Sequence, residues 1–353
     1  MKMALASDEK SYMQDLKEKW QLFKQENPKV RIRNAAEALG VSEAELVATG
    51  IGETAVRLKA EWGKIIKRLP KLGEILCITR NDDAVHEKNG KFGAVSVSPG
   101  HALVVNREID LRIFFSHWHF GFAVTENTER GERKSLQFFD LSGASVHKVY
   151  LTDGSNFEAY YELVSQFRAD NQYTEIKTTA HAPLPVEVPD EKIEADRMRK
   201  HWLALQDTHD FIQILRDFGV SRVQALRLAG TDLAFEVSKG AFRYALEKAS
   251  HTGLPIMIFV GNKGCIQIHT GPVKRIVDSG DWLNILDPRF DLHVRESQID
   301  KAWVVRKPTN DGIVTSLELF DKNNNQILTM FGERKPGQPE LKDWTALCAD
   351  LPK

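Results

Sequence analysis

The residues that could perform chemistry begin with a histidine at the start of a helix-forming segment, Asp207-Thr208-His209. The macrodipole of a helix disfavours a charged imidazole at its N-terminus, so we expect His209 to stay neutral. A neutral imidazole is the form that binds metal ions. From the residues alone, a histidine that caps the helix or is satisfied in the core is the more common interpretation, and metal ligation is the alternative.

The same helix has an apolar stripe made of Phe211, Ile214, Leu215 and Phe218. A neutral imidazole beside an apolar wall suits a flat, iron-containing ligand such as haem. The two propionates of haem need cations at the mouth of a pocket, and arginine forks bind carboxylates well. The candidate cations are Arg222, Lys307 and Arg334.

Other chemical signatures are weaker. The chain has no GxGxxG, P-loop, GxSxG or HExxH motif. His117 and His119 would share one face of a strand and could chelate a metal, but no third ligand lies nearby in the sequence. Exposed or partly buried histidines are the favoured interpretation of this pair.

A helix-turn-helix pattern, NAAEALGVSEAELVATG, raises the possibility of DNA binding. A helix that enters the major groove needs basic and amide side chains, whereas SEAELVATG has two glutamates and neither lysine nor arginine. A structural pair of helices is therefore favoured.

The chain contains an internal repeat. The matching pairs Asn81 and Asn262, Asp110 and Asp291, and Asp140 and Asp321 are each 181 residues apart. LGVSEAELVATG also matches FGVSRVQALRLAG at an offset of 179 residues, and both fit a Gly helix end followed by an S-x-x-E/Q capping box. Each half therefore predicts helices, then a run of strands, then a closing helix.

The strand patterns predict antiparallel hairpins. WVVRKPTNDGIVTSLELF indicates two strands around an Asn-Asp-Gly turn, and LQFFDLSGASVHKVYL indicates a pair around Ser-Gly. The expected fold class is α+β, an internal duplication in which each half is an antiparallel β-sheet with packed helices. We predict an N-terminal repeat over 1–172, a Pro-rich and acidic linker over 173–196, and a C-terminal repeat over 197–353.

Composition limits the class of protein. The 353 residues are 42% hydrophobic and 27% charged, which predicts a globular protein of about two domains. A net charge of −1 gives no general attraction for nucleic acid or anionic membranes. The sequence predicts no signal peptide and no membrane span, and its three separate cysteines favour a reducing cytoplasm.

Several segments together resemble the cytoplasmic haem-trafficking and hemin-degrading proteins of bacterial haem-uptake systems. The resemblance runs over nearly the whole chain, in family order, through ITRNDDAVHE, DLRIFF, QFFD, HKVY, THDF, MIFVGNKGCIQI and RKPTNDGIVTSLELF. It implies a duplicated α+β fold that binds b-type haem mainly in its C-terminal half.

The resemblance also implies roles for single residues. His209, in THDF, matches the proximal ligand of the haem iron, and Arg112, in DLRIFF, matches a residue that reaches the distal side, with Phe114 similarly placed. His86 matches a histidine proposed as a second haem ligand, although its repeat partner is Gln267. The positions that contact propionates are matched by Arg222, Lys307, Phe331 and Arg334.

The chain departs from the family at three positions. Thr329 and Phe331 stand where Gln and Tyr are expected, so a phenolic donor to the propionates is missing. Ile212 stands where some members have a second histidine, which disfavours exchange of the iron ligand within this helix.

Three functions follow from the resemblance and the residues. The main hypothesis is a haem carrier that accepts imported haem through a proximal histidine and delivers it to a haem oxygenase. The alternative is a haem-degrading enzyme that opens the porphyrin and releases iron with an external reductant, with Arg112 acting electrostatically on the distal side. A DNA-binding regulator is disfavoured by the acidic helix. The expected partners are haem and an oxygenase or reductant donor, with a monomer or homodimer as the oligomeric state.

Overall fold

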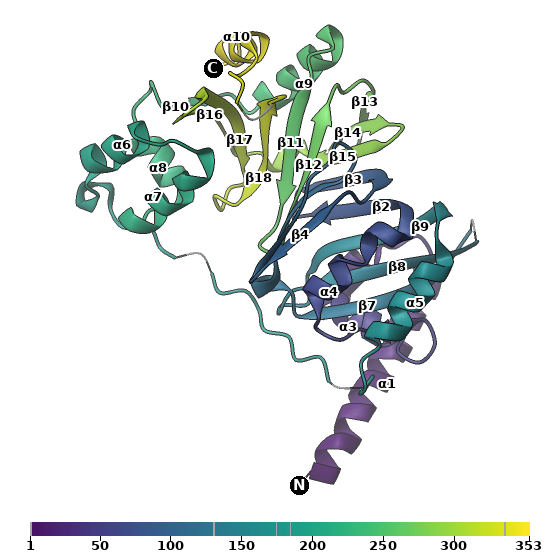
Figure 1. The fold of residues 1–353 in the computed structure, drawn as a ribbon. Helices are drawn as coiled ribbons and strands as arrows, with labels where there is room; N and C mark the ends of the chain where they lie inside the picture. The colour runs from purple at the N-terminus through teal and green to yellow at the C-terminus, as the bar shows by residue number, and fades with distance from the viewer. Residues whose placement is uncertain (1, 130, 174, 184, 335–336) are drawn as a thin grey trace. The chain divides into compact units, whose positions relative to one another are not determined.

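The computed structural model describes residues 2–129, 131–173, 175–183, 185–334 and 337–353, without the side chains of 2–11. The chain forms two compact units (Figure 1). Unit 1 comprises Met1–Arg80, Lys88–Ala182 and Asn262–Ile266, and unit 2 comprises Asn81–Glu87, Pro183–Gly261 and Gln267–Lys353. Each unit therefore includes a short segment from the other half of the sequence.

Unit 1 combines antiparallel strands with helices. One set of strands follows the order β1 (Ala55–Arg57), β7 (Phe120–Thr128), β8 (Gly131–Phe139), β9 (Ser145–Ser155) and β2 (Gly73–Arg80). A second set is β6 (Asp110–Phe114), β5 (His101–Val104) and β4 (Val95–Ser98). The helices are α1 (Lys2–Glu26), α2 (Ile32–Leu39), α3 (Glu43–Ala48), α4 (Trp62–Ile66) and α5 (Phe157–Phe167), with 3₁₀ turns η1 (Leu69–Leu72) and η2 (Phe115–His117).

Unit 2 repeats this plan. Its strands follow the orders β10 (Ala234–Val237), β16 (Lys301–Thr309), β17 (Gly312–Phe320), β18 (Gln326–Gly332) and β11 (Ile256–Gly261), and β15 (Phe290–Arg295), β14 (Trp282–Asp287) and β13 (Ile276–Ser279). Its helices are α6 (Ala195–Leu203), α7 (Phe211–Phe218), α8 (Arg222–Leu228), α9 (Ala241–Thr252) and α10 (Lys342–Ala349), with 3₁₀ turns η3 (Asp190–Lys192), η4 (Thr208–Asp210) and η5 (Glu296–Gln298). Strands β3 (Ala84–Lys91) and β12 (Cys265–Gly271) each contribute residues to both units.

The predicted α+β duplication is confirmed. The two predicted hairpins form as β16 with β17 and β8 with β9, and both pairs are antiparallel. Each half ends in the predicted closing helix, which is α5 in unit 1 and α10 in unit 2. The three-part division at 172 and 196 stays a proposal about the limits of the repeats.

The duplication extends to single hydrogen bonds. In unit 2, the side-chain amide of Asn81 donates to the carbonyls of Gly261 and Ile327 at 3.1 and 2.8 Å. In unit 1, the side-chain amide of Asn262 donates, at 2.9 Å each, to the carbonyls of Arg80 and Val146, which are the repeat equivalents of Gly261 and Ile327. The amide oxygen of each asparagine also accepts from the backbone N–H groups two and three residues later. Equivalent asparagines therefore fix equivalent turns.

The predicted helix boundaries are also present. Gly40 and Gly219 end α2 and α7 with φ values of 69° and 60°, a left-handed conformation that a residue without Cβ adopts readily. This turn lets the chain start α3 and α8 immediately afterwards.

One of the two predicted capping boxes is incomplete. Ser42 and Glu45 form the reciprocal pair of hydrogen bonds. Ser221 accepts from the backbone N–H of Gln224 at 3.0 Å, but the side-chain oxygen of Gln224 accepts no hydrogen bond among the described residues. The prediction of a second complete box is wrong, because the side-chain amide of Gln224 instead donates to Asp190 of the linker at 2.8 Å, and a carboxylate is a strong acceptor.

The linker predicted over 173–196 is fixed at both of its ends. In unit 1, His181 Nε2 lies 3.0 Å from the Asp140 carboxylate. In unit 2, the Arg227 guanidinium donates to Asp190 at 2.8 and 2.9 Å. The linker therefore has specific partners although its sequence has no core-forming pattern.

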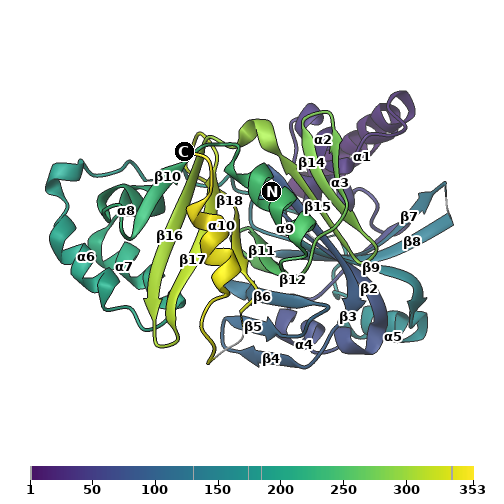
Figure 2. The ribbon, with the colours of Figure 1, turned by 90° about the horizontal axis from the view of Figure 1, so that it is seen from above.

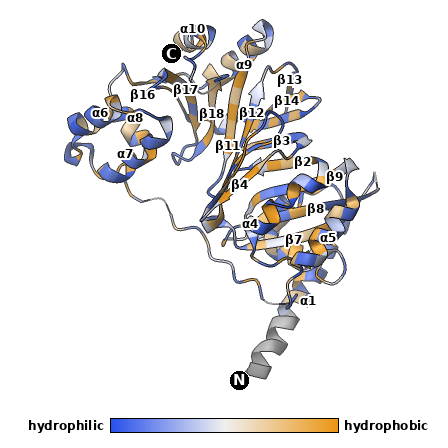
Figure 3. Ribbon diagram, viewed as in Figure 1, coloured by the Kyte–Doolittle hydropathy of each residue, from blue (hydrophilic) through white to orange (hydrophobic). Residues whose placement is uncertain are grey.

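Separate hydrophobic clusters stabilise the units, and hydrophobic residues are prominent on strands such as β2 and β11 (Figure 3). In unit 2, α9 and α10 pack on the face formed by β11, β17 and β18 (Figure 2). A further cluster in unit 2 lies among α6, α7, α8, β10 and β16, around the buried Trp202. Among the described residues, no helix is both long and apolar enough to cross a membrane.

The paired asparagines give a test of the duplication. Asn81→Ala and Asn262→Ala should each lower the free energy of unfolding by about 1–3 kcal/mol, because each leaves backbone groups of a turn without partners. Chemical denaturation measures this change, and the exposed Asn323→Ala is the control, with an expected effect below about 0.5 kcal/mol. Variants that unfold like the control would show that the turns do not depend on these amides.

Candidate functional site

His209 lies in the 3₁₀ turn η4 immediately before α7, and its side chain is 83% exposed. The turn is held in place by core packing, because the buried rings of Trp202 and Phe211 pack edge to face with centroids 4.4 Å apart. The Gln206 carbonyl accepts from the Asn310 backbone N–H at 3.0 Å, which joins the turn to the β16–β17 hairpin. An exposed imidazole is thus held on a well-packed support.

Asp207 orients this imidazole. Its carboxylate oxygen Oδ1 accepts from the backbone N–H of His209 at 2.8 Å and lies 2.6 Å from His209 Nδ1. The backbone N–H of His209 holds the pKa of the Asp207 carboxyl below its usual value, with smaller contributions from the ring and Arg334. An ionised carboxylate only accepts hydrogen bonds, so Nδ1 carries the proton and Nε2 is the available ligand atom.

A buried cluster of charges lies under the same helices. Glu318 on β17 is fully buried and accepts from the Arg222 guanidinium at 2.6 and 2.8 Å and from Lys307 Nζ at 2.9 Å. Burial lowers the pKa of Lys307 to about 8. Burial alone would raise the pKa of Glu318, but Arg222 and Lys307 together hold it well below its usual range. The cluster contains one more cation than carboxylate.

The cluster is packed against the start of α7. Lys307 Nζ lies 4.7 Å, and the Arg222 guanidinium carbon 5.2 Å, from the centre of the Phe211 ring. Cations over an aromatic face are favourable, so Phe211 joins the cation cluster to the turn that carries His209.

Two further predicted residues lie in or just after strand β18, which are Phe331 and Arg334. Arg334 acts electrostatically on Asp207, and its buried Nε has no hydrogen-bond partner among the described residues. The Phe331 ring packs against Phe259 at 5.1 Å, and Thr329 accepts from a neighbouring glutamine side chain. Unit 2 therefore contains six of the predicted site residues, which are His86, His209, Arg222, Lys307, Phe331 and Arg334.

Three of the predicted residues, Arg112, Phe114 and His86, lie on strands β6 and β3. Arg112 and Phe114 are on β6 of unit 1, where Arg112 pairs with Asp110 and Phe114 is exposed. His86 is fully buried on β3, with its ring 4.9 Å from that of Phe290. The roles assigned to all three residues stay predictions.

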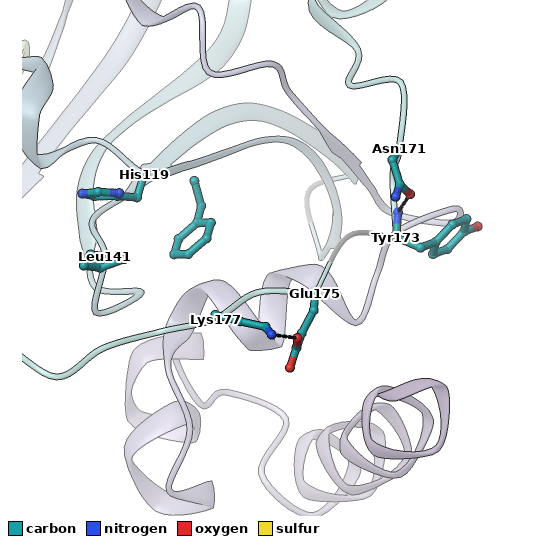
Figure 4. A pocket seen from close by; sticks show the side chains of 7 residues that line it. His119, Leu141, Asn171, Tyr173, Glu175 and Lys177 are labelled. Atoms are coloured by element: carbon teal, nitrogen blue, oxygen red, sulfur yellow. Dashed lines mark hydrogen bonds and ion pairs between the residues drawn. The ribbon is translucent and has the colours of Figure 1, made fainter. Parts of the chain in front are cut away.

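The histidine pair of unit 1 is exposed, as favoured from the sequence. His117 ends the 3₁₀ turn η2 and His119 follows it, so the two are not on one strand. His119 lines an open pocket of about 560 Å³, together with Phe120, Leu141, Asn171, Tyr173, Glu175 and Lys177 (Figure 4). No group of three potential metal ligands occurs within the described part of the chain.

The repeat position in unit 1 has different chemistry. Val30 stands at the position equivalent to His209, and Gln137 at the position equivalent to Glu318. The counterpart of Arg222 is Glu43, which is buried and paired with Lys148. The histidine and the surplus of cations therefore occur in unit 2 and not at the equivalent positions of unit 1.

The sequence matches the model of the haemin-degrading HemS.ChuX domain twice, over residues 40–167 and 219–351. The chain belongs to this family. The two matches correspond to the two halves of the duplication.

Two relatives are similar to this chain in sequence over most of their length. The hemin transport protein HemS of Yersinia enterocolitica is 40% identical over 331 residues, which is 93% of this chain and 94% of HemS. The hemin transport protein HmuS of Yersinia pestis is 38% identical with the same coverage.

Two solved structures are similar to this chain in fold over almost its whole length. Holo-PhuS, a heme-binding protein from Pseudomonas aeruginosa, has a TM-score of 0.94 and 43% identity, covering 96% of this chain and 99% of PhuS. ChuS, described as an Escherichia coli heme oxygenase, has a TM-score of 0.87 and 38% identity, covering 96% and 99%.

The sequence did not lead us to predict Glu318 as the shared partner of Arg222 and Lys307. A lone carboxylate in the apolar strand segment TSLELF was a usable signal, because a charge inside a sheet core requires a partner. We also did not predict the side-chain contact of Asp207, although Asp at an N-cap is a strong local pattern.

The buried cluster predicts a specific response to acid. The pKa of Glu318 is depressed below its ordinary 4.5, so its stabilising contribution is complete above that pH and is lost as the pH falls further. Glu318→Gln should lower the free energy of unfolding by about 3–5 kcal/mol near pH 7, because the buried Lys307 and the partly buried Arg222 lose their partner.

The cost of Glu318→Gln should shrink below pH 4.5 in urea denaturation at a series of pH values. Glu236→Gln, at an exposed strand position, is the matched control and should leave the profile unchanged. A cost that stays constant down to pH 2 would contradict the charged state of Glu318.

Proposed function

We propose that the protein binds haem through His209 Nε2 and delivers it to a haem oxygenase. The observation that carries the proposal is an exposed imidazole, oriented by a carboxylate, near Phe211, against which a cluster with a surplus cation is packed. Membership of the HemS.ChuX family and similarity to hemin transport proteins support it.

The residues present fit haem. The iron needs a neutral nitrogen ligand, and the Asp207 contact favours the tautomer whose Nε2 has a free electron pair. The macrocycle needs apolar surface, and Ile212 and Ile313 expose about half of their side chains in this part of unit 2. The propionates need cations, and the buried Arg334 Nε lacks a partner among the described residues.

The cations should have unequal roles. Arg222 and Lys307 already share Glu318, so they would meet a propionate as one cluster of limited net charge. The Nε of Arg334 has no hydrogen-bond partner among the described residues, so Arg334 would be the direct partner. Phe331 supplies apolar contact without a hydroxyl donor. We propose in addition that Arg112 and Phe114 lie on the distal side and that His86 serves a second site.

A carrier must also release its cargo. Bound haem supplies an iron centre that accepts a nitrogen ligand and a ring that an oxygenase can open. His209 provides a single protein bond to that iron from an exposed turn, so transfer requires one bond to break. Ile212, at the next turn of the helix, offers no second nitrogen to retain the iron.

Haem degradation by this protein is the second candidate. The similarity to ChuS, a heme oxygenase at 38% identity, favours it, and the same residues would hold the substrate. Arg112 would then position the distal reactants electrostatically. The electrons would come from an external donor.

The setting of the function follows from the same account. The three cysteines are free and buried, which suits the reducing cytoplasm where we place the protein. We propose haem and an oxygenase or reductant donor as partners, and a monomer or homodimer as the working state. Nucleic acid is not proposed as a partner, because most of the second helix of the N-terminal pair, α3, is buried.

Loss of the ligand should be visible in the spectrum. His209→Ala should shift the Soret band and weaken haem binding at least tenfold, about 1.4 kcal/mol, because the iron loses its nitrogen donor. Absorbance titration with ferric haem measures both. The exposed His251→Ala is the control. Wild-type affinity and spectrum in His209→Ala would refute the ligand assignment.

Carrier and enzyme make opposite predictions for the purified haem complex. We expect the porphyrin to survive incubation with a reductant and catalase, and the haem to move to an added haem oxygenase. Absorbance and mass spectrometry follow both fates. Catalase is required because free peroxide destroys haem without an enzyme. A defined ring-opened product, formed without added oxygenase, would favour the enzyme instead.

A further inference from the structure

Asp207 makes two hydrogen bonds with one oxygen atom. Oδ1 accepts from the backbone N–H of His209 at 2.8 Å and from the ring Nδ1 at 2.6 Å. The first bond is an ordinary N-cap, because Asp207 precedes η4 in an extended conformation, with φ −140° and ψ 143°. The second bond is not required to cap the helix. It fixes the plane and the tautomer of the exposed His209 ring.

The chemical effect of the second bond depends on the charge of its acceptor. A carboxylate that accepts from Nδ1–H draws the proton towards itself and increases the electron density on the opposite nitrogen. A more basic Nε2 binds Fe(III) more strongly than Fe(II), because the higher charge gains more from a better donor. A neutral amide acceptor at the same place would hold the tautomer less firmly and would have a much weaker electronic effect.

We propose that Asp207 is a positioning residue that acts through His209 to strengthen its bond to ferric haem iron and to lower the reduction potential of the complex. The inference rests on the proposed function, since it requires His209 to be the iron ligand. A bound iron that stays ferric does not bind oxygen, so the contact would protect haem during transfer and favour the carrier over the enzyme.

The surroundings of Asp207 support this role. Its Oδ1 accepts from the backbone N–H of His209 as well as from the ring, so the same cap that starts the turn holds the carboxylate against the imidazole. Its neighbour Asp210 lies in the same turn and caps α7 without a side-chain hydrogen bond. The chain therefore offers two carboxylates at nearly the same place, of which Asp207 contacts the ring.

The test compares Asp207→Asn with Asp210→Asn. Asparagine is as good an N-cap as aspartate, so Asp207→Asn keeps the cap and removes the charge. Asp210→Asn removes the same charge from the same turn and is the matched control. In the haem-free protein, nitrogen-15 NMR of the imidazole at pH 8 should show Nδ1–H in the wild type and the control, and a larger population of Nε2–H in Asp207→Asn.

The haem complexes give the second readout. We expect Asp207→Asn to lower the iron–histidine stretching frequency of the ferrous complex in resonance Raman spectra, to raise the midpoint potential, and to weaken ferric haem binding about 10- to 100-fold. Asp210→Asn should match the wild type in all three. An Asp207→Asn complex that matches the wild type would overturn the inference.

Failure of the inference differs from failure of the proposed function. If His209→Ala removes the iron–histidine band while Asp207→Asn leaves frequency and potential unchanged, His209 is the ligand and only the role of Asp207 is wrong. If His209→Ala keeps the wild-type band, the ligand assignment is wrong and the role of Asp207 is lost with it.

Discussion

The site depends on one buried carboxylate. Glu318 has no contact with solvent and accepts from Arg222 on α8 and Lys307 on β16, so it joins three elements of unit 2 by charge. A lone carboxylate in this place would be strongly destabilising, and either cation without it would be equally so. The two cations in turn cover Phe211, the first residue of the helix that follows His209. The position of the exposed imidazole is thus coupled to a cluster whose carboxylate solvent does not reach.

Duplication explains why the two units differ in chemistry while they share a fold. The turns at Asn81 and Asn262 are equivalent to the level of single hydrogen bonds, so the framework of both units is specified in the same way. The helix–sheet contact has diverged. Unit 1 keeps a balanced pair, Glu43 with Lys148, whereas unit 2 has two cations on one carboxylate. An anionic ligand is therefore favoured in unit 2.

Much of this fold could be predicted from the sequence because its determinants are local or periodic. A constant offset of 181 residues predicted the repeat, and Asn-Asp-Gly and Ser-Gly turns predicted the hairpins. Gln224 shows the limit of this reasoning. Its sequence pattern fits a capping box, but its side chain donates a hydrogen bond to a carboxylate of the linker, which lies far away in the sequence. Glu318 shows the same limit for the site. Arg222 and Lys307 were predicted as ligands for propionates, but their shared partner depends on strand pairing that no local pattern encodes.

In the proposed complex, one nitrogen atom, His209 Nε2, binds the haem iron. Anomalous scattering from crystals of the haem complex, recorded at the iron absorption edge, tests this most directly because it locates the iron without reference to any variant. The predicted result is a strong peak within bonding distance of His209 Nε2. Iron peaks of which none lies within bonding distance of His209 Nε2 would contradict the central claim.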